Sequence, residues 1–296
     1  MERATIDAPA ARTACEVCGG DLLPAQMVNG YRYGSCAQCR CMQLRDGASE
    51  TEVFGLYSDS YFHGNSAGGY NDYLAEGTLL RAAGRRYGKL LKRFISVGDL
   101  LDVGSAAGFM VAGLQDTGWR ARGLELNASM AEWGRQTMRV SIDTESLERF
   151  QSTQQFDAIT MVQVVAHFYD LASALANAAK LTKTGGLWLV ETWNARSLTA
   201  RLFGTQWHEL NPPSVRRIFT PKSLAIAASR LGMEQIAFGR PAKRILSAHA
   251  KSLVAQKAQT GRLAQALSRA AALLPGNLVL PYPAEDLFWA LYRKTA

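Results

Sequence analysis

The sequence predicts an α/β fold with a mostly parallel sheet, preceded by a small cysteine-rich module. Short apolar runs alternate with helical patterns between residues 96 and 192, and this alternation is typical of parallel sheets covered by helices on both faces. The segment LLDVGSAAGFM, residues 100–110, predicts a strand, a tight turn and a helix. Two C-x-x-C pairs near the start of the chain predict the separate module.

Composition and pattern divide the 296 residues into five parts. This length allows a main domain of ordinary size with a small appendage. The parts are a disordered tail at 1–13, a cysteine module at 14–45, a tyrosine-rich lid and lead-in helix at 46–95, the main domain at 96–240, and a basic helical insertion with the last strand at 241–296.

Within the main domain, the apolar periodicity predicts the elements in order. Strands are expected at 99–103, 119–125, 139–142, 156–162 and 186–192, and helices at 107–117, 128–138 and 170–182. Asn127 is a plausible N-cap for the second of these helices. A further helix is expected after Thr220, because Pro221 at a first helical position loses no hydrogen bond.

The turn at 104–108 and the acid that ends the next strand favour a nucleoside ligand. Gly104 and Gly108 let the backbone turn sharply, and the small residues between them leave room for a ligand. Glu125 comes at the carboxyl end of the neighbouring strand, where a carboxylate can accept hydrogen bonds from both ribose hydroxyls. The turn lacks the G-x-G-x-x-G spacing that binds a pyrophosphate, so a nucleoside without one fits better.

Four blocks in order carry a resemblance to a known family: LLDVGSAAG, GLELN, FDAITMVQVVAHF and LTKTGGLWLVETWN. Over roughly residues 76–240 the chain resembles a class I S-adenosylmethionine (SAM)-dependent methyltransferase. The resemblance implies a Rossmann-like seven-stranded sheet, whose last two strands would be 231–239 and 285–294. Ala106 departs from the pattern, since many members have a second glycine there.

The resemblance also implies how SAM would be held. Asp102 and the 104–108 backbone would hold the methionine part, Glu125 the ribose, and Leu126 the adenine, while the 143–147 turn closes the adenine side. The expected cofactor-binding residues are Asp102, Gly104, Ser105, Ala106, Gly108, Glu125, Leu126, Ser146, Leu147 and Gln163.

His167 is the expected catalytic base. It follows the fourth strand of the sheet, at the edge where open α/β sheets bind ligands, and a hydroxyl or carbon acceptor must lose a proton. Resembling enzymes often have V-L-E-H here, whereas this chain has V-V-A-H, so Ala166 supplies no carboxylate neighbour. The alternative is a histidine that only orders the loop or shapes the cofactor pocket.

Five residues are weaker candidates for substrate contact. Tyrosine hydroxyls in the 46–75 stretch could reach the acceptor, although they could equally pack a lid. An arginine after the fifth strand could grip a phosphate or carboxylate, unless it is an ordinary surface arginine. The candidates are Tyr61, Tyr70, Trp207, His208 and Arg216.

The cysteines predict a zinc ribbon. Cys15 and Cys18 form one pair and Cys36 and Cys39 the other, and each pair can place two thiolates on one tetrahedral ion. Cys41 falls at the wrong spacing and is expected to pack in the interior. A closed four-cysteine site is structural, and so small a module would take much of its folding energy from the metal.

Charge and targeting signals limit the partners. The net charge is +8, and no acidic residue occurs between Glu234 and Glu285. This basic block favours an anionic neighbour, such as acidic lipid headgroups, a phosphorylated substrate or nucleic acid, unless it is a solvated helix face. No spanning helix or signal peptide is expected, so a cytoplasmic protein follows, with peripheral membrane contact at 241–276 as an open option. The oligomeric state is not predicted.

Three functions remain open from the sequence. The first is methyl transfer to oxygen or carbon of a small molecule, such as a sugar, a lipid-linked glycan or a natural product. The second is RNA modification with a ribbon that grips RNA, although residues 163–168 read QVVAHF and lack the N/D-P-P-Y/F pattern of many base-nitrogen methylating enzymes. The third is a non-catalytic binding partner, against which Asp102, Gly104 and Glu125 weigh.

Overall fold

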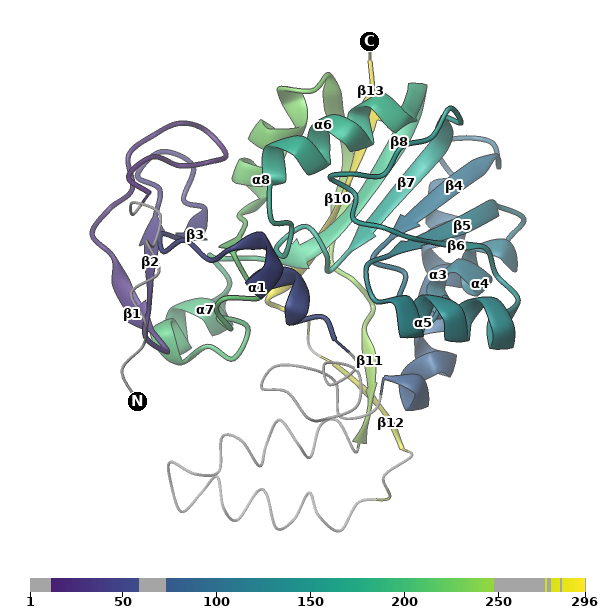
Figure 1. Cartoon of the computed structure of the whole chain (residues 1–296), viewed down its shortest axis with the longest axis horizontal. Helices are drawn as coiled ribbons and strands as arrows, with labels where there is room; N and C mark the ends of the chain where they lie inside the picture. Colours follow the sequence, from purple (N-terminus) through teal and green to yellow (C-terminus); the bar gives the residue numbers. More distant parts are fainter. Residues whose placement is uncertain (1–11, 59–72, 248–274, 276–277, 283, 296) are drawn as a thin grey trace.

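The computed structural model describes residues 12–58, 73–247, 275, 278–282 and 284–295. Figure 1 shows an open twisted sheet with helices on both faces, and a small module of strands beside it. Most of the predicted tail at 1–13 and most of the basic insertion at 241–276 lie outside the described residues.

The main sheet has seven strands in the order β10-β13-β8-β7-β4-β5-β6. The five strands from β8 to β6 are parallel to one another, whereas β13 runs antiparallel to both β8 and β10. The fold expected from the alternating pattern is therefore confirmed. The strands are β4 (Asp99–Val103), β5 (Arg120–Glu125), β6 (Ile142–Thr144), β7 (Phe156–Val162), β8 (Thr182–Trp193), β10 (Met233–Gly239) and β13 (Leu287–Lys294).

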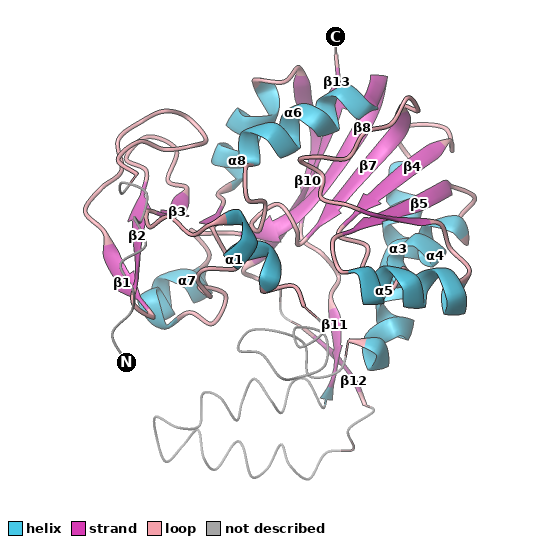
Figure 2. Ribbon diagram, in the orientation of Figure 1, coloured by secondary structure: helices cyan, strands magenta, loops and turns pink. Residues whose placement is uncertain are grey.

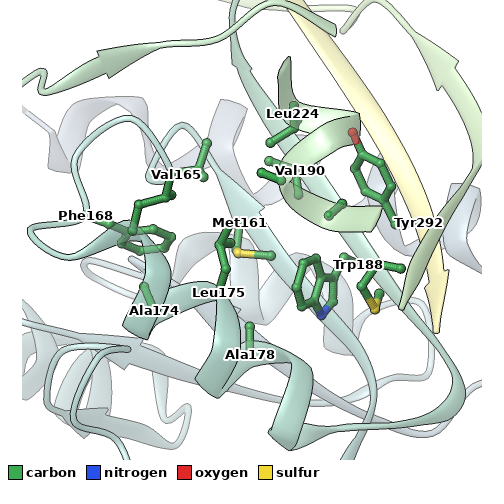
Figure 3. Packing of buried hydrophobic residues seen from close by; sticks show 14 of the residues in the cluster. Met161, Val165, Phe168, Ala174, Leu175, Ala178, Trp188, Val190, Leu224 and Tyr292 are labelled. Carbon is green, nitrogen blue, oxygen red and sulfur yellow. The ribbon is translucent and has the colours of Figure 1, made fainter. Parts of the chain in front are cut away.

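Helices cover the two faces of this sheet (Figure 2). On one face lie α3 (Gly77–Leu91), α4 (Phe109–Gln115) and α5 (Ala128–Trp133), which pack on inward residues such as Leu100 and Leu189. On the other face, α6 (Leu171–Leu181) and α8 (Pro221–Ser229) pack on Met161, Trp188 and Tyr292 (Figure 3). Alternate residues of each strand thus enter opposite cores, because strand side chains alternate between faces.

Several local predictions are confirmed and others need adjustment. The Asn127 side chain accepts a hydrogen bond from Met130 N at 2.7 Å, so it is an N-cap. The helix predicted to 138 stops being α-helical at Trp133 and continues as one π-helical stretch, Gly134–Met138. Pro221 occupies the first turn of α8. The predicted helical insertion begins instead with a strand, β11 (Arg244–Leu246), which pairs antiparallel with β12 (Val279–Pro281).

The cysteine module is a small antiparallel sheet made of β1 (Gln26–Val28), β2 (Tyr31–Ser35) and β3 (Met42–Leu44). A fourth strand, β9 (Arg217–Ile218), comes from far along the chain and pairs with β3. The buried cysteines also pack into the same apolar cluster as α6 and α8. The module is therefore joined to the main domain by a shared sheet and by a shared apolar core. A boundary at residue 45 does not by itself predict these contacts.

Short elements complete the described chain: α1 (Glu50–Gly55), the 3-10 turn η1 (Leu74–Glu76), α7 (Leu198–Phe203) and the 3-10 turn η3 (Gly204–Gln206). Among the described residues, no helix is long and apolar enough to cross a membrane.

Candidate active site

The turn between β4 and α4 has the geometry that a close-approaching ligand needs. Gly104 and Gly108 adopt φ of 72° and 75°, the left-handed region that disfavours other residues. A Cβ at Gly104 would lie 3.0 Å from Val164, and one at Gly108 would lie 2.5 Å from Val140. Ala106 also has a positive φ, of 45°. Alanine therefore occupies a conformation that suits glycine, which accounts for the glycine of resembling enzymes at this position.

Glu125 ties this turn to the end of β5. Its Oε2 accepts a hydrogen bond from Ala106 N at 2.7 Å, and its Oε1 accepts one from Asn127 N at 2.8 Å. The side chain is 6% exposed, and burial raises the pKa of its carboxyl. Each carboxylate oxygen keeps a second lone pair, so the group can still accept hydrogen bonds from a ligand.

Asp102 is the next-to-last residue of β4, close to the same turn. Its Oδ1 accepts a hydrogen bond from the Thr160 hydroxyl at 2.6 Å. Burial and, to a smaller extent, the nearby Glu125 charge raise the pKa of Asp102 to about 7, although the Thr160 hydrogen bond lowers it. A cationic group placed here would restore the ionised form, because an opposite charge favours it.

A cavity of about 420 Å³ opens at the carboxyl edge of the sheet, a size typical of small-molecule sites. Ser105 Oγ, at its wall, is buried and has no hydrogen-bond partner within the described chain. Gly108 shapes the turn from behind without lining the cavity. Nine of the ten predicted cofactor residues do line it: Asp102, Gly104, Ser105, Ala106, Glu125, Leu126, Ser146, Leu147 and Gln163.

His167 lines the same cavity. Its Nδ1 lies 2.9 Å from Ser214 O and 2.9 Å from the Tyr57 hydroxyl. Because a carbonyl oxygen can only accept, Nδ1 carries the proton and Nε2 keeps its lone pair. The ring also packs edge-on against Tyr57 and Trp193. Burial lowers the pKa of His167, so the imidazole is neutral near pH 7.

Sequence reasoning missed a polar network in the wall of the cavity. The Glu191 carboxylate of β8 accepts hydrogen bonds from the Tyr87 hydroxyl of α3 and from Gln163 Nε2, the latter at 2.8 Å. Gln163 has a φ of 57°, and its N–H donates to Glu191 O at 2.8 Å. The helical pattern predicts α3, but nothing in it tells which turn of the helix meets β8.

The part of the cavity nearest α3 and the β10–β11 link has a different character. Its wall is largely apolar, with four cations around it and with the acids Glu76, at the start of α3, and Glu191 also among the lining residues. None of the four makes an ion pair with a carboxylate within the described parts of the chain. The apolar residues are Leu79, Ala83, Leu90, Met110, Val162, Pro241, Ile245 and Trp289, and the cations are Arg86, Arg240, Lys243 and Arg244.

None of the three weaker substrate candidates that the structure describes lines the cavity. Tyr61 and Tyr70 lie outside the described residues. Trp207 is 2% exposed and packs in a core with Tyr33, away from the cavity wall. His208 Nε2 lies 3.1 Å from Glu209 Oε1, and Arg216 lies over the ring of Tyr169. Neither of these two lines the cavity.

The four predicted metal ligands come together in the module. The Sγ atoms of Cys15, Cys18, Cys36 and Cys39 all lie within 4.8 Å of one another. The Cys15–Cys39 and Cys18–Cys36 Sγ pairs are 3.6 and 3.3 Å apart, close to the ~3.8 Å expected for thiolates 2.3 Å from a tetrahedral zinc. Cys41 is fully buried and is not one of the four, as expected.

This sheet order, with a nucleoside-type turn and a ribose-type acid at one cavity, defines a class I SAM-dependent methyltransferase, and the protein is such an enzyme. The chain belongs to the methyltransferase domain family, whose sequence model matches residues 75–237. That match covers the described main domain from η1 to β10 and leaves the cysteine module outside it.

Individual relatives are distant. A ubiquinone biosynthesis O-methyltransferase from Rhodopseudomonas palustris is 25% identical over 115 residues, which cover 36% of this chain and 45% of that protein. The matching part thus spans less than half of that relative's length.

Two solved structures share the fold. A SAM-dependent methyltransferase from Thermotoga maritima has a TM-score of 0.51 and 18% identity, over 76% of this chain and 95% of the other. The 1,6-didemethyltoxoflavin-N1-methyltransferase of Burkholderia thailandensis, solved with its substrate and S-adenosylhomocysteine, has a TM-score of 0.52 and 14% identity, over 92% and 99%. At these identities the likeness concerns the fold.

Proposed function

We propose that this enzyme methylates an oxygen or carbon atom of a small-molecule acceptor, with His167 as the general base. The observation that carries the proposal is the state of His167 at the cavity. Its Nδ1–H is held by Ser214 O, so Nε2 is the proton acceptor. A neutral imidazole of lowered pKa is ready to take a proton at neutral pH.

The residues at the turn fit SAM, which supplies a methyl group already activated by its sulfonium. Glu125 would accept hydrogen bonds from the ribose. Ser105 Oγ is buried and has no hydrogen-bond partner among the residues that the structure describes, so a ligand could supply one. Asp102 would face the methionine end, where its ionised form suits a cationic amine. Ser146, Leu147 and Leu126 would enclose the adenine.

The acceptor would occupy the part of the cavity near α3. Apolar side chains there suit a hydrophobic body, and the four cations, which form no ion pair with a carboxylate of the described residues, suit a phosphate or carboxylate. An anionic acceptor with an apolar part fits this wall, and a lipid-linked glycan is one such molecule. The O-methyltransferase relative is consistent with an oxygen acceptor.

The four-cysteine module would hold one structural zinc ion. Four thiolates at these separations suit tetrahedral zinc, and a closed set of four leaves no open position for catalysis.

The test compares two variants with tritiated-methyl SAM and extracts of the source cells. His167→Gln should keep its affinity for S-adenosylhomocysteine, because the turn and Glu125 are intact, but should lose about 10²-fold or more in methyl transfer. Glu125→Ala should lose roughly 2–3 kcal/mol of cofactor binding, because two charge-assisted hydrogen bonds are removed. Calorimetry and label counting measure the two effects.

The distribution of the label identifies the acceptor class. Label in small molecules or in the lipid extract supports the proposal. Label in ribonuclease-sensitive material would instead make the enzyme an RNA methyltransferase. Full activity of His167→Gln would refute the role of His167.

A further inference from the structure

Residues 214–218 link the cysteine module to the loop that carries His167. On one side, β9 pairs with β3 of the module, and Leu44 N donates to Arg216 O at 2.8 Å. On the other side, the N–H groups of Arg216 and Arg217 both donate to Ala166 O, at 3.0 and 3.2 Å. A single short segment therefore hydrogen-bonds to the module and to the residue just before His167.

The side chain of Arg217 makes the same link a second time. It is 1% exposed, and its Nη1 and Nη2 donate to Phe168 O and Tyr169 O, at 2.6 and 3.4 Å. Its Nε donates to the carboxylate of Glu16, which stands between the thiols of Cys15 and Cys18 in the sequence. Burial lowers the pKa of Arg217 to about 10, so it stays charged at neutral pH. The buried Arg217 side chain thus joins the turn between Cys15 and Cys18 to the carbonyls of Phe168 and Tyr169, the two residues that follow His167.

A third link acts on the partner of the imidazole. Ser214 O, which accepts from His167 Nδ1, precedes Val215, whose carbonyl accepts a hydrogen bond from the Tyr33 hydroxyl of β2. Tyr33 is 1% exposed and belongs to the same sheet as β3. The module therefore holds the chain on both sides of His167, which a merely appended metal module would not need to do.

We propose that the four-cysteine module is a positioning device for His167, with Arg217 and Glu16 as the positioning residues. The inference rests on the proposed function, since it gives His167 a catalytic task. In this arrangement a zinc ion held by the four cysteines would fix the Cys15–Cys18 turn and therefore the position of Glu16. Glu16 and Arg217 together then fix the carbonyls of Phe168 and Tyr169, which follow His167. Buried polar groups that are fully paired specify one arrangement of a loop in this way.

The experiment compares Arg217→Met with Arg230→Met in the full-length zinc-loaded protein. Arg230 also bonds to the module, through Cys18 O at 3.0 Å, but within the described residues its side chain makes no hydrogen bond or ion pair with the loop that carries His167, so it is the matched control. Nitrogen-15 NMR follows the imidazole of His167 through a pH titration. The signal is assigned among the four histidines by its loss in His167→Gln.

Arg217→Met should keep one zinc and should bind S-adenosylhomocysteine within about twofold of wild type. Its His167 pKa should rise towards about 6.5, because the loosened loop admits water. The titratable groups that face His167 are Tyr57 and Glu209, and neither is changed. Once an acceptor is identified, kcat should be at least tenfold lower than in wild type. The acidic side of the pH profile of kcat should shift by the same amount as the pKa of His167. Arg230→Met should match wild type in every measurement.

If Arg217→Met fails to fold, Glu16→Gln is used in its place. The Glu16 side chain is 21% exposed, and the glutamine amide has the same shape as the carboxylate that it replaces. The proposal is overturned if the titration of His167 in the folded variant equals that of wild type, or if Arg230→Met shifts it equally. An active His167→Gln would refute the proposed base, whereas the NMR comparison would still decide whether the module positions this ring.

Discussion

At the scale of single residues, the site depends on two buried acids that do different work. Burial raises the pKa of Glu125, but two backbone N–H groups donate to its carboxylate, so it organises the turn even without a ligand. Asp102 accepts a hydrogen bond from one hydroxyl, that of Thr160, and burial raises its pKa to about 7. The sequence predicts both acids from their places at the ends of strands, but it cannot predict how differently the two are solvated.

The pKa of Asp102 gives the cofactor-free protein a specific pH dependence. The ordinary value is 3.8 and the folded value is about 7, so between them the folded state binds more protons than the unfolded one. This group therefore costs stability as pH rises from 4 to 7, by up to about 1.4 kcal/mol for each pH unit. In urea denaturation, the free energy of unfolding of Asp102→Asn relative to that of wild type should therefore increase between pH 5 and pH 7. Parallel pH profiles for the two proteins would contradict the buried, raised carboxyl.

At the scale of elements, the periodicity of the sequence predicts the helices and strands of the main domain but not the contacts that join distant elements. The strands from 99 to 192 and the helix at 171–181 fall close to the predicted ranges, because alternating and 3.6-residue patterns reflect burial directly. Two-residue β9 has no such pattern, so its pairing with β3 could not be foreseen. The Tyr87–Glu191 contact depends on the placement of α3 against β8, which no local pattern encodes.

The shared core predicts how the module responds to loss of metal. Cys36, Cys39 and Cys41 pack in one cluster with Phe219 and Leu224 of the main domain. One zinc should be found per chain by metal analysis of freshly reduced protein. Removing it with a chelator and a mercurial should lower the Tm of a single calorimetric transition, because the module and the domain lose contacts together. A separate early transition would show that the module unfolds alone, and protein without any metal would contradict the ribbon.

At the scale of the whole molecule, the positive charge and two exposed leucines lead us to expect contact with an anionic membrane. The net charge is +8, and the acid-free window between Glu234 and Glu285 concentrates it. In the described part, α7 exposes Leu198 and Leu202 at 57% and 72%. Lipid headgroups attract such basic stretches, and apolar side chains insert beside them.

The protein should therefore sediment with anionic vesicles at low salt and release as salt rises. Binding should weaken when Lys251, Lys257 and Arg262 become Gln, three positions outside the described residues. Neutral phosphatidylcholine vesicles serve as the control. Protein that stays in the supernatant with anionic vesicles at low salt would rule out membrane contact and leave the basic stretch with another role.

The strand shared between module and domain also has a consequence for synthesis. The cysteines and β3 leave the ribosome long before β9 is made, since about 170 residues separate the two strands. Throughout that interval the nascent module presents an unpaired strand edge, the kind of surface that recruits other chains. A ribosome stalled before residue 217 would thus carry the four cysteines of the module while its sheet is still incomplete. Only when the last third of the chain emerges does the edge close, and His167 acquires its support at the same moment.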